Sequence, residues 1–469
     1  MSASVLHQEI EGRPPARVAV IGAGYWGKKV IRETLDVGRT TGRVQVHAVV
    51  DNSPTMLSHC QNEFGPLDYR LDYHELLTDP KLSGVHICTP NQPHFEMAAD
   101  FLKHGKDVLV EKPLTLNSKD AFELVKIASK HNRVLCVGHI HRFNNGVREL
   151  RRALASGILG ELFYVRFGWT GFLPPQSYRD VITDLSPHPF DICNYLLGSW
   201  PNHITCRGKG FRTEENEEVA FITAEHPNGL VAQIEISWLD REKRRDVTVV
   251  GSKAEAYLDC SEQKGVLRTA EGTRQISIVP SNTLRSEITH FVDCVEANSL
   301  SKPVHNLTPG IQGAHVVRSI EAARESLRER KTVTLTQLHT LTSMPKSTDR
   351  GSELLLESRL EPASTSLWDQ SLLDPDHSLA DEIRQQSLIA RIRSSRYRSG
   401  IIQSLKDSDL TPKELASRVG LDLSNLGKYL NDLMLNELVE RKTPLGLRKG
   451  RLYGLTERCR GIATRMDWE

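Results

Sequence analysis

Long apolar stretches are absent from this chain of 469 residues. No segment approaches the roughly 20 apolar residues that cross a bilayer. The N-terminal segment carries acids and no apolar core, so it does not have the pattern of a secretory signal. The formal net charge of +1 gives no strong overall attraction to nucleic acid, so any such affinity must come from a local patch. We therefore expect a soluble, cytoplasmic protein that does not contact a membrane.

Cysteine pairs at ligand spacing are absent as well. The eight cysteines are scattered along the chain, and none of them forms a CxxC pair. This pattern argues against a disulfide framework and predicts reduced thiols and no metal site. The length allows two or three domains.

A glycine turn is the most informative motif. Residues 17–27 read RVAVIGAGYWG. Arg17–Ile21 is a short β-branched run that predicts a buried parallel strand, and a helical pattern follows from Tyr25 to about Val37. A GxGxxG between a strand and a helix predicts a dinucleotide site, with the phosphates at the helix N-terminus. The predicted cofactor contacts in this turn are Gly22, Ala23, Gly24, Tyr25, Trp26 and Gly27.

An acidic residue closes the second predicted strand. Val44–Val50 is followed by Asp51, at about the distance where an acid meets the adenosine ribose. Asn52 comes next rather than an arginine, which favours NAD over NADP. The alternative is that Asp51 is an ordinary polar residue that ends a strand.

Strands and helices alternate as far as residue 138. Further predicted strands are Val85–Cys88, Asp107–Val110 and Val134–Val137. The alternation predicts that residues 17–138, after a tail at 1–16, form a doubly wound Rossmann domain of the α/β class. Ligands bind at the carboxyl ends of such strands. The candidates for cofactor binding at those ends are Thr89, Pro90, Asn91, Glu111 and Lys112.

The pattern changes after His139. Long alternating runs predict that residues 139–335 form an α+β domain with a large, open, mostly antiparallel sheet. Helices at Phe190–Leu197, Ile288–Ala297 and Ile311–Arg328 should cover one face. We expect the other face, within 160–280, to form a homodimer or homotetramer.

The C-terminal part has a different composition. Residues 336–380 are rich in Ser, Thr, Pro and Asp and predict a flexible linker. In 381–469, a capping box at Thr411–Glu414 opens a helix that ends at Gly420, and a second helix follows from Ser424 to about Glu437. Two short strands with a basic hairpin then complete the pattern of a winged helix-turn-helix. Its predicted DNA contacts are Ser424, Asn425, Lys428, Tyr429, Arg448, Lys449 and Arg451. The alternative is a module for protein contacts only.

Five motifs resemble the Gfo/Idh/MocA oxidoreductases over about residues 17–335. They are IGAGYWG, CTPNQPH at 88–94, GKDVLVEKPL at 105–114, VGHIHRF at 137–143 and DLSPHPFDI at 184–192. The run SWLDREKRRDVTVVGS at 237–252 resembles members that act on sugars, including nucleotide-sugar 3-dehydrogenases. The resemblance implies NAD(P) on the first domain and substrate against the open sheet. Residues 179–183 depart from the glycine run that is frequent in the family, and 381–469 resembles bacterial and archaeal winged-helix regulators instead.

The resemblance also implies an active site. Lys112 would be the lysine of the EKP motif, in contact with cofactor and substrate, where it stabilises a developing alkoxide. His188 would be the general acid–base, because the ordinary pKa of histidine lies near the working pH. Asp184 would orient that ring or bind a substrate hydroxyl. His94 would contact the cofactor or merely cap a helix, and Arg142 would bind substrate or pair with an acid. Taken alone, EKP could be a loop that ends a strand, and Asp184 and His188 could form a helix cap.

These features together predict a function. We expect an NAD-dependent dehydrogenase that oxidises a secondary hydroxyl of a sugar, nucleotide sugar or cyclitol, fused to a DNA-binding module with a regulatory role. One alternative is a non-catalytic transcriptional regulator that senses NAD or a sugar. Another is an enzyme whose tail serves only protein contacts.

Overall fold

The computed structural model describes residues 14–174, 179–212, 216–335, 392, 395–406, 408–435, 438–442, 452–456 and 459–460. The chain divides into two units, Met1–Gln370 and Ser371–Glu469. Among the helices in these described ranges, none combines the length and apolar character needed to cross a membrane.

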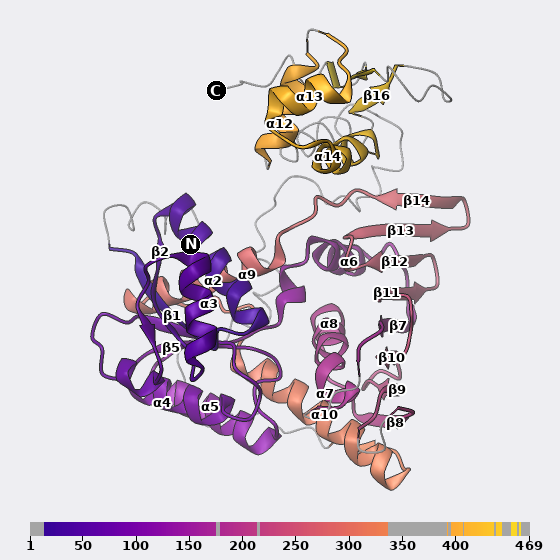
Figure 1. Cartoon of the computed structure of the whole chain (residues 1–469). Helices are drawn as coiled ribbons and strands as arrows, with labels where there is room; N and C mark the ends of the chain where they lie inside the picture. Colours follow the sequence, from indigo (N-terminus) through magenta and orange to yellow (C-terminus); the bar gives the residue numbers. More distant parts are fainter. Residues whose placement is uncertain are drawn as a thin grey trace. The chain divides into compact units, whose positions relative to one another are not determined.

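A six-stranded parallel sheet organises the N-terminal part (Figure 1). Its spatial order is β3-β2-β1-β4-β5-β6, and every neighbouring pair is parallel. The strands are β1 (Ala16–Ile21), β2 (Val44–Val50), β3 (Tyr69–Arg70), β4 (Gly84–Ile87), β5 (Asp107–Val110) and β6 (Leu135–Val137). This is the doubly wound order, with its switch point between β1 and β4. The predicted Rossmann sheet is confirmed.

Helices cover both faces of this sheet. One face carries α2 (Tyr25–Thr41), α3 (Pro54–Phe64) and α9 (Thr283–Ser299), and the other carries η1 (Tyr73–Leu76), α4 (His94–Lys103), α5 (Ser118–Lys130) and the first half of α10 (Gly310–Glu329). The prediction that the helix around Ile288–Ala297 covers the second sheet is wrong. In α9, Ile288 and Phe291 share one core with Val18 and Val20 of β1. The apolar stripe of α9 therefore closes the Rossmann layer.

A nine-stranded mixed sheet follows in sequence. Its order is β14-β13-β12-β11-β7-β10-β9-β8-β15, and β7 and β10 pair in parallel while the other pairs are antiparallel. The strands are β7 (Leu162–Thr170), β8 (His203–Lys209), β9 (Val219–Glu225), β10 (Val231–Ser237), β11 (Arg244–Gly251), β12 (Glu255–Asp259), β13 (Lys264–Thr269), β14 (Gly272–Ile276) and β15 (Val333–Thr334). The sequence did not predict β8 or β14. Four of the five residues of β14 are exposed, so that strand carries no apolar alternation.

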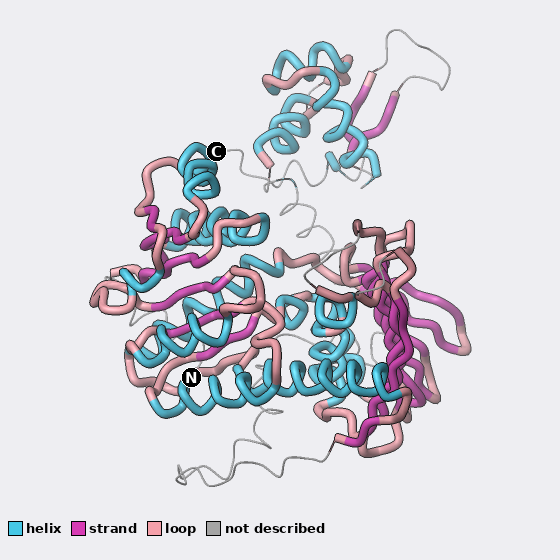
Figure 2. Tube along the Cα trace, turned by 60° about the horizontal axis from the view of Figure 1, so that its bottom comes forward, coloured by secondary structure: helices cyan, strands magenta, loops and turns pink. Residues whose placement is uncertain are grey.

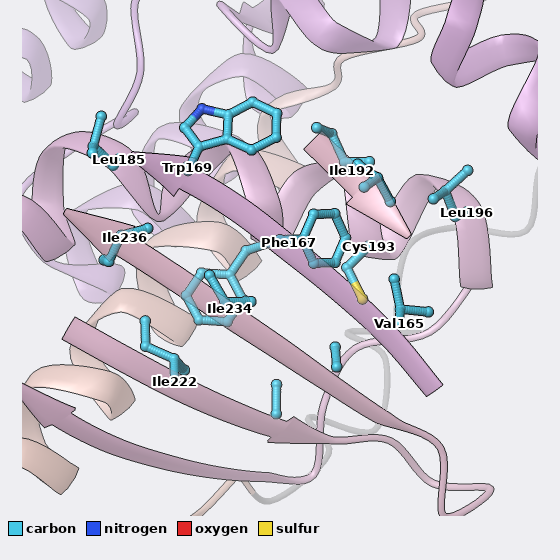
Figure 3. Close-up of a cluster of buried hydrophobic side chains, with 14 of the residues drawn as sticks. Val165, Phe167, Trp169, Leu185, Ile192, Cys193, Leu196, Ile222, Ile234 and Ile236 are labelled. Atoms are coloured by element: carbon cyan, nitrogen blue, oxygen red, sulfur yellow. The ribbon is translucent and has the colours of Figure 1, made fainter. Parts of the chain in front are cut away.

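One face of the large sheet is packed against helices (Figure 2). These are α6 (Asn145–Ser156), α7 (Val181–Leu185), α8 (Pro187–Leu197) and the second half of α10. Figure 3 shows side chains of β7, β9 and β10, among them Phe167 and Ile234, beside Ile192 and Cys193 of α8. The opposite face bears exposed aromatic side chains: Phe221 is 50% exposed and Tyr164 is 38% exposed.

The second unit has its own core. It contains α12 (Arg396–Ser404), α13 (Pro412–Val419), α14 (Leu423–Leu435) and the antiparallel strands β16 (Val439–Arg441) and β17 (Tyr453–Leu455). The predicted capping box at Thr411 and Glu414 is present, and Gly420 ends α13 in the left-handed region with a φ of 67°. The buried residues of its core include Ile402, Leu415 and Leu430.

Several predictions concern residues outside the described ranges. They are the linker at 336–380, most of the tail at 1–16, and the DNA contacts Arg448, Lys449 and Arg451. The side chains of Ser424 and Lys428 also lie outside the description.

Candidate active site

The glycine turn has the geometry that a dinucleotide requires. Gly22 has a φ of 97°, and a Cβ there would lie 2.8 Å from the carbonyl carbon of Cys88. A Cβ on Gly27 would lie 1.8 Å from the carbonyl oxygen of Gly22, so the helix packs directly on the turn. A Cβ on Gly24 would meet no atom within 4 Å, which leaves open space at the N-cap of α2. A pyrophosphate fits there, beside the N-terminus of the helix.

Asp51 lies beside this turn. Its Oδ2 accepts the backbone N–H of Ala23 at 2.7 Å, and its Oδ1 accepts that of Ser53 at 2.9 Å. These bonds fix the carboxylate at the carboxyl end of β2, next to the turn. Each oxygen keeps a lone pair, so the group still fits a ribose hydroxyl.

Glu111 ties the end of β5 to the glycine turn. Its Oε1 accepts the indole N–H of Trp26 and lies 3.3 Å from Nε2 of His86. Burial would raise the pKa of Glu111, but His86, Trp26 and the charge of Lys112 hold it below its ordinary value. His86, Cys88 and Glu111 bring possible metal-ligand atoms within 4.8 Å of one another, a grouping that the sequence spacing did not show. The hydrogen bonds from Trp26 and His86 already use Glu111 Oε1.

His94 connects two loops of the cofactor side. The ring is fully buried, with Nδ1 3.0 Å from the carbonyl oxygen of Pro113 and Nε2 3.1 Å from that of Thr89. The N-cap of α4 is Pro93, so His94 does not cap the helix. The cap role is therefore wrong: His94 holds the two loops that carry Thr89 and Lys112, and both of its nitrogens face backbone.

Lys112 meets Asp184 between the two sheet domains. The Nζ of Lys112 donates to the carbonyl oxygen of Asp184 at 2.7 Å and lies 3.3 Å from Oδ1 of the same residue. Arg179 donates to that Oδ1 at 2.9 Å. Burial would raise the pKa of Asp184, but the charges of Lys112 and Arg179 outweigh it and keep the pKa below its ordinary value. Asp184 is therefore an ionised partner of two cations.

His188 lies in an aromatic pocket near this pair. Its ring centroid is 4.9 Å from that of His141 in an edge-to-face arrangement and 6.0 Å from that of Trp169. Burial lowers the pKa of His188 well below 6.5, and the positive charge of Lys112 lowers it further. The sequence predicted a pKa near the working pH for His188. Burial in this pocket makes that prediction wrong. His188 is neutral at pH 7, so it is ready to accept a proton.

Asp184 does not orient His188 in this arrangement. The two residues lie on different helices, α7 and α8, and the carboxylate of Asp184 pairs with Lys112 and Arg179. No hydrogen bond joins Asp184 to His188 among the described residues. A spacing of four residues would put both side chains on one face of a single helix, but α7 ends and α8 begins at Ser186, between them.

Arg142 follows the acid-pairing alternative. It is 6% exposed, and its guanidinium donates to Asp191 at 2.7 Å, to Asn194 at 3.0 Å and to the carbonyl oxygen of Leu307 at 3.1 Å. These contacts place it in the interior and disfavour a role in binding substrate.

Sequence reasoning missed three members of the site: Arg179, His141 and Trp169. Arg179 lies five residues before Asp184, in the segment that departs from the family pattern. That departure was the signal in the sequence that could have pointed to Arg179. Trp169 lies on β7 and His141 on η2 (Ile140–Phe143), and their ring centroids are 5.1 Å apart. Nothing in the local sequence indicates this contact.

Two family models match the chain. One, described as an oxidoreductase family with an NAD-binding Rossmann fold, matches residues 16–139. The other, the GFO/IDH/MocA C-terminal domain, matches residues 147–257. This chain belongs to the Gfo/Idh/MocA oxidoreductases. As a member of that family it is an oxidoreductase that uses NAD and acts on CH–OH donors.

Named relatives of this oxidoreductase act on polyols and sugars. Myo-inositol 2-dehydrogenase of Thermotoga maritima is 23% identical over 342 residues, which cover 69% of this chain and 99% of the relative. UDP-N-acetylglucosamine 3-dehydrogenase of Acidithiobacillus ferrooxidans is 25% identical over 312 residues, 64% of this chain and 94% of the relative. A solved oxidoreductase of Agrobacterium radiobacter, in complex with NAD+, L-tartaric acid and magnesium, is 22% identical and shares the fold with a TM-score of 0.61, covering 68% of this chain and 98% of that one.

Proposed function

We propose that this oxidoreductase oxidises a secondary hydroxyl of a sugar, nucleotide sugar or cyclitol. The observation that carries the proposal is the juxtaposition of Lys112, Asp184 and the neutral His188 where the cofactor domain meets the large sheet. Myo-inositol and UDP-N-acetylglucosamine, the compounds named for two relatives, are both rich in secondary hydroxyls.

The side chains divide the chemistry between them. A nicotinamide, when bound, supplies the hydride acceptor. His188, kept neutral by its pocket, takes the hydroxyl proton. Lys112 has three N–H donors and uses two of them on Asp184, so the third is left for the substrate oxygen, whose developing negative charge it stabilises. Asp184, itself paired with Arg179, holds the ammonium group in position.

A substrate screen tests this proposal. Purified full-length protein would be incubated with NAD and a panel of aldoses, cyclitols and nucleotide sugars while NADH absorbance is followed. At least one compound should be oxidised, and the same preparation carrying Lys112→Ala should lose that reaction. Saturable binding of a sugar with no NADH formed from any compound would contradict the proposal and support the non-catalytic sensor.

We also propose that residues 381–469 form a winged helix-turn-helix that binds DNA. The order α12, α13, α14, β16, β17, with a capped α13 and a glycine turn before α14, supports this reading. Asn425 is exposed on the first turn of α14, and its amide bonds Asp422 at 2.6 Å. Tyr429 is half-buried against Tyr397, with ring centroids 5.4 Å apart, so it contributes to the core as well. A regulatory role linked to substrate or NAD belongs to the same proposal.

The free face of the large sheet supports a homodimer or homotetramer. Tyr164 and Phe221 are exposed there on β7 and β9. Burying such side chains against a second copy would remove apolar surface from water. Light scattering at micromolar concentration should find an oligomer, and a monomer alone would contradict this part of the proposal.

A further inference from the structure

A cavity of about 810 Å³ lies at the C-terminal end of α10, beside β8 and the start of α7. Figure 1 shows this end of α10 near β8 and β9. The charged residues that line it are Asp180, Arg207, Glu217, Arg324, Arg328 and Arg330. None of them belongs to the active site described above.

Positive charge dominates this arginine cavity. Four guanidinium groups face two carboxylates, and one of those, Asp180, is 4% exposed and committed elsewhere. Its oxygens accept the N–H of Thr183 at 2.7 Å and the hydroxyl of Thr183 at 3.1 Å. Arg324 pairs with Asp180 at 3.5 Å and is 55% exposed, and Arg328 pairs with Glu329 at 3.2 Å. Arg207 and Arg330 have no ion-pair partner among the described residues, and the C-terminus of the helix adds only about half a negative charge against them.

Arg207 is held in place by the backbone. Its guanidinium donates to the carbonyl oxygen of Cys206 at 2.7 Å and to that of Arg330 at 2.9 Å. Two fixed contacts reduce the entropy that the side chain loses on binding, and the planar fork suits a phosphate or carboxylate group.

Arg330 occupies a position that normally favours glycine. It ends α10 in the left-handed region with a φ of 54°. An L-residue is strained in this region, and glycine is the usual residue at such helix ends. Its side chain has no ion-pair partner among the described residues. Arg330 therefore has a strained backbone and a cationic side chain that lines the cavity. Its contacts do not explain this arrangement by a role in folding.

We propose that the arginine cavity binds a small, multiply charged oxyanion, of the size and charge of pyrophosphate. Such an anion pairs with several guanidinium groups at once, whereas a monovalent anion cannot use them together. The site is separate from the glycine turn, and the proposal does not depend on which sugar the enzyme oxidises.

Calorimetric titration of inorganic pyrophosphate into the full chain tests the proposal. The protein would first be saturated with NAD, so that the glycine turn is already occupied, and kept at low ionic strength, where charge pairing is least screened. We expect one pyrophosphate per chain. Arg330→Gly, which relieves the backbone while removing a charge, should weaken binding severalfold, and Arg330→Gly with Arg324→Gln should weaken it at least tenfold.

Two controls make the result decisive. Arg268→Gln removes an arginine from β13 that pairs with Glu255, outside the cavity, and should leave pyrophosphate affinity unchanged. Citrate in place of pyrophosphate separates a site for phosphates from one for any polyanion. Absence of pyrophosphate binding to the unaltered protein, or equal affinity in the cavity variants and Arg268→Gln, would overturn the proposal. Retained NAD affinity in each variant shows that the fold is intact.

Discussion

The ammonium group of Lys112 donates a 2.7 Å hydrogen bond to the backbone carbonyl of Asp184, a residue 72 positions further along the chain. Lys112 follows strand β5 of the Rossmann sheet, and Asp184 lies on α7 against the large sheet. The bond therefore joins the cofactor domain to the substrate domain at the point where chemistry is proposed.

Lys112→Ala should lower turnover by at least about 100-fold on the identified substrate, because the substrate oxygen loses its positive partner. The loss should appear in kcat, with the unfolding midpoint little changed. Lys126→Ala is a matched control, since the Lys126 side chain is 58% exposed and, within the described ranges, its ion-pair partner is Glu123 of its own helix. Turnover of Lys112→Ala close to that of the control would remove Lys112 from the site.

The pocket around His188 leads to a prediction about pH. Because the pKa of His188 is lowered well below 6.5, the neutral base should persist on acidification, and the acid limb of kcat/KM in the free enzyme should lie below pH 6.5. His188→Ala should abolish most turnover at every pH. An acid limb centred at or above pH 6.5 in the unaltered enzyme would show that the pocket does not exert this effect.

The same shift has a consequence for stability. A histidine that binds its proton less readily in the folded state than in the unfolded chain destabilises the fold as pH falls below about 6.5, with a slope of up to about 1.4 kcal/mol per pH unit. Burial also lowers the pKa of His141 and of His226 to about 4, so they act in the same direction. Urea unfolding at several pH values should show the free energy of unfolding decreasing from pH 6.5 towards pH 4.

His94 should matter through the loops it connects. His94→Phe keeps the ring volume but removes the one N–H of the neutral imidazole, so the carbonyl of Thr89 or Pro113 that accepts it loses its donor, at a cost of about 1–3 kcal/mol. We expect a lower unfolding midpoint together with a raised KM for NAD. His94→Gln can still donate a hydrogen bond to a loop carbonyl. It should therefore restore part of the unfolding midpoint and part of the affinity for NAD. A variant with reduced stability and an unchanged KM for NAD would show that His94 supports the fold without positioning the loops.

Cofactor preference should follow Asp51. The carboxylate beside the glycine turn repels a 2′-phosphate, and no arginine follows it in sequence, so NAD(H) should bind at least about tenfold more tightly than NADP(H). Asp51→Ser should reduce the difference in affinity between NAD(H) and NADP(H). Calorimetric titration measures both affinities, and NADPH binding as tight as NADH in the unaltered protein would contradict the assignment.

The C-terminal module is tested separately from catalysis. Replacing Arg448 and Lys449 with alanine should weaken DNA binding and reduce its salt dependence while dehydrogenase turnover is unchanged. A genome-wide pull-down with the full chain, with and without NAD and substrate, identifies the site. If no sequence is enriched in either condition, the module serves protein contacts instead.

The sequence predicted those elements that depend on residues close to one another in the chain. The glycine turn, the strand Val44–Val50 and the capping box at Thr411 each depend on neighbours within a few residues, and each has the predicted form. The sequence also predicted that the motifs after β4 and β5 lie close together. The order of a doubly wound sheet brings the carboxyl ends of these two neighbouring strands to one edge.

Only the tertiary structure decided how distant residues are used. The apolar stripe of α9 would fit either sheet, and packing placed it on the Rossmann layer. Arg142 carries the same charge in any setting, but burial beside Asp191 and Asn194 gave it internal partners. The low pKa of His188 comes first from burial and then from the charge of Lys112 and from His141, Arg245 and His139, all distant in sequence. Residue types and short spacings are written in the chain, whereas burial and the field of distant charges exist only once the chain has folded.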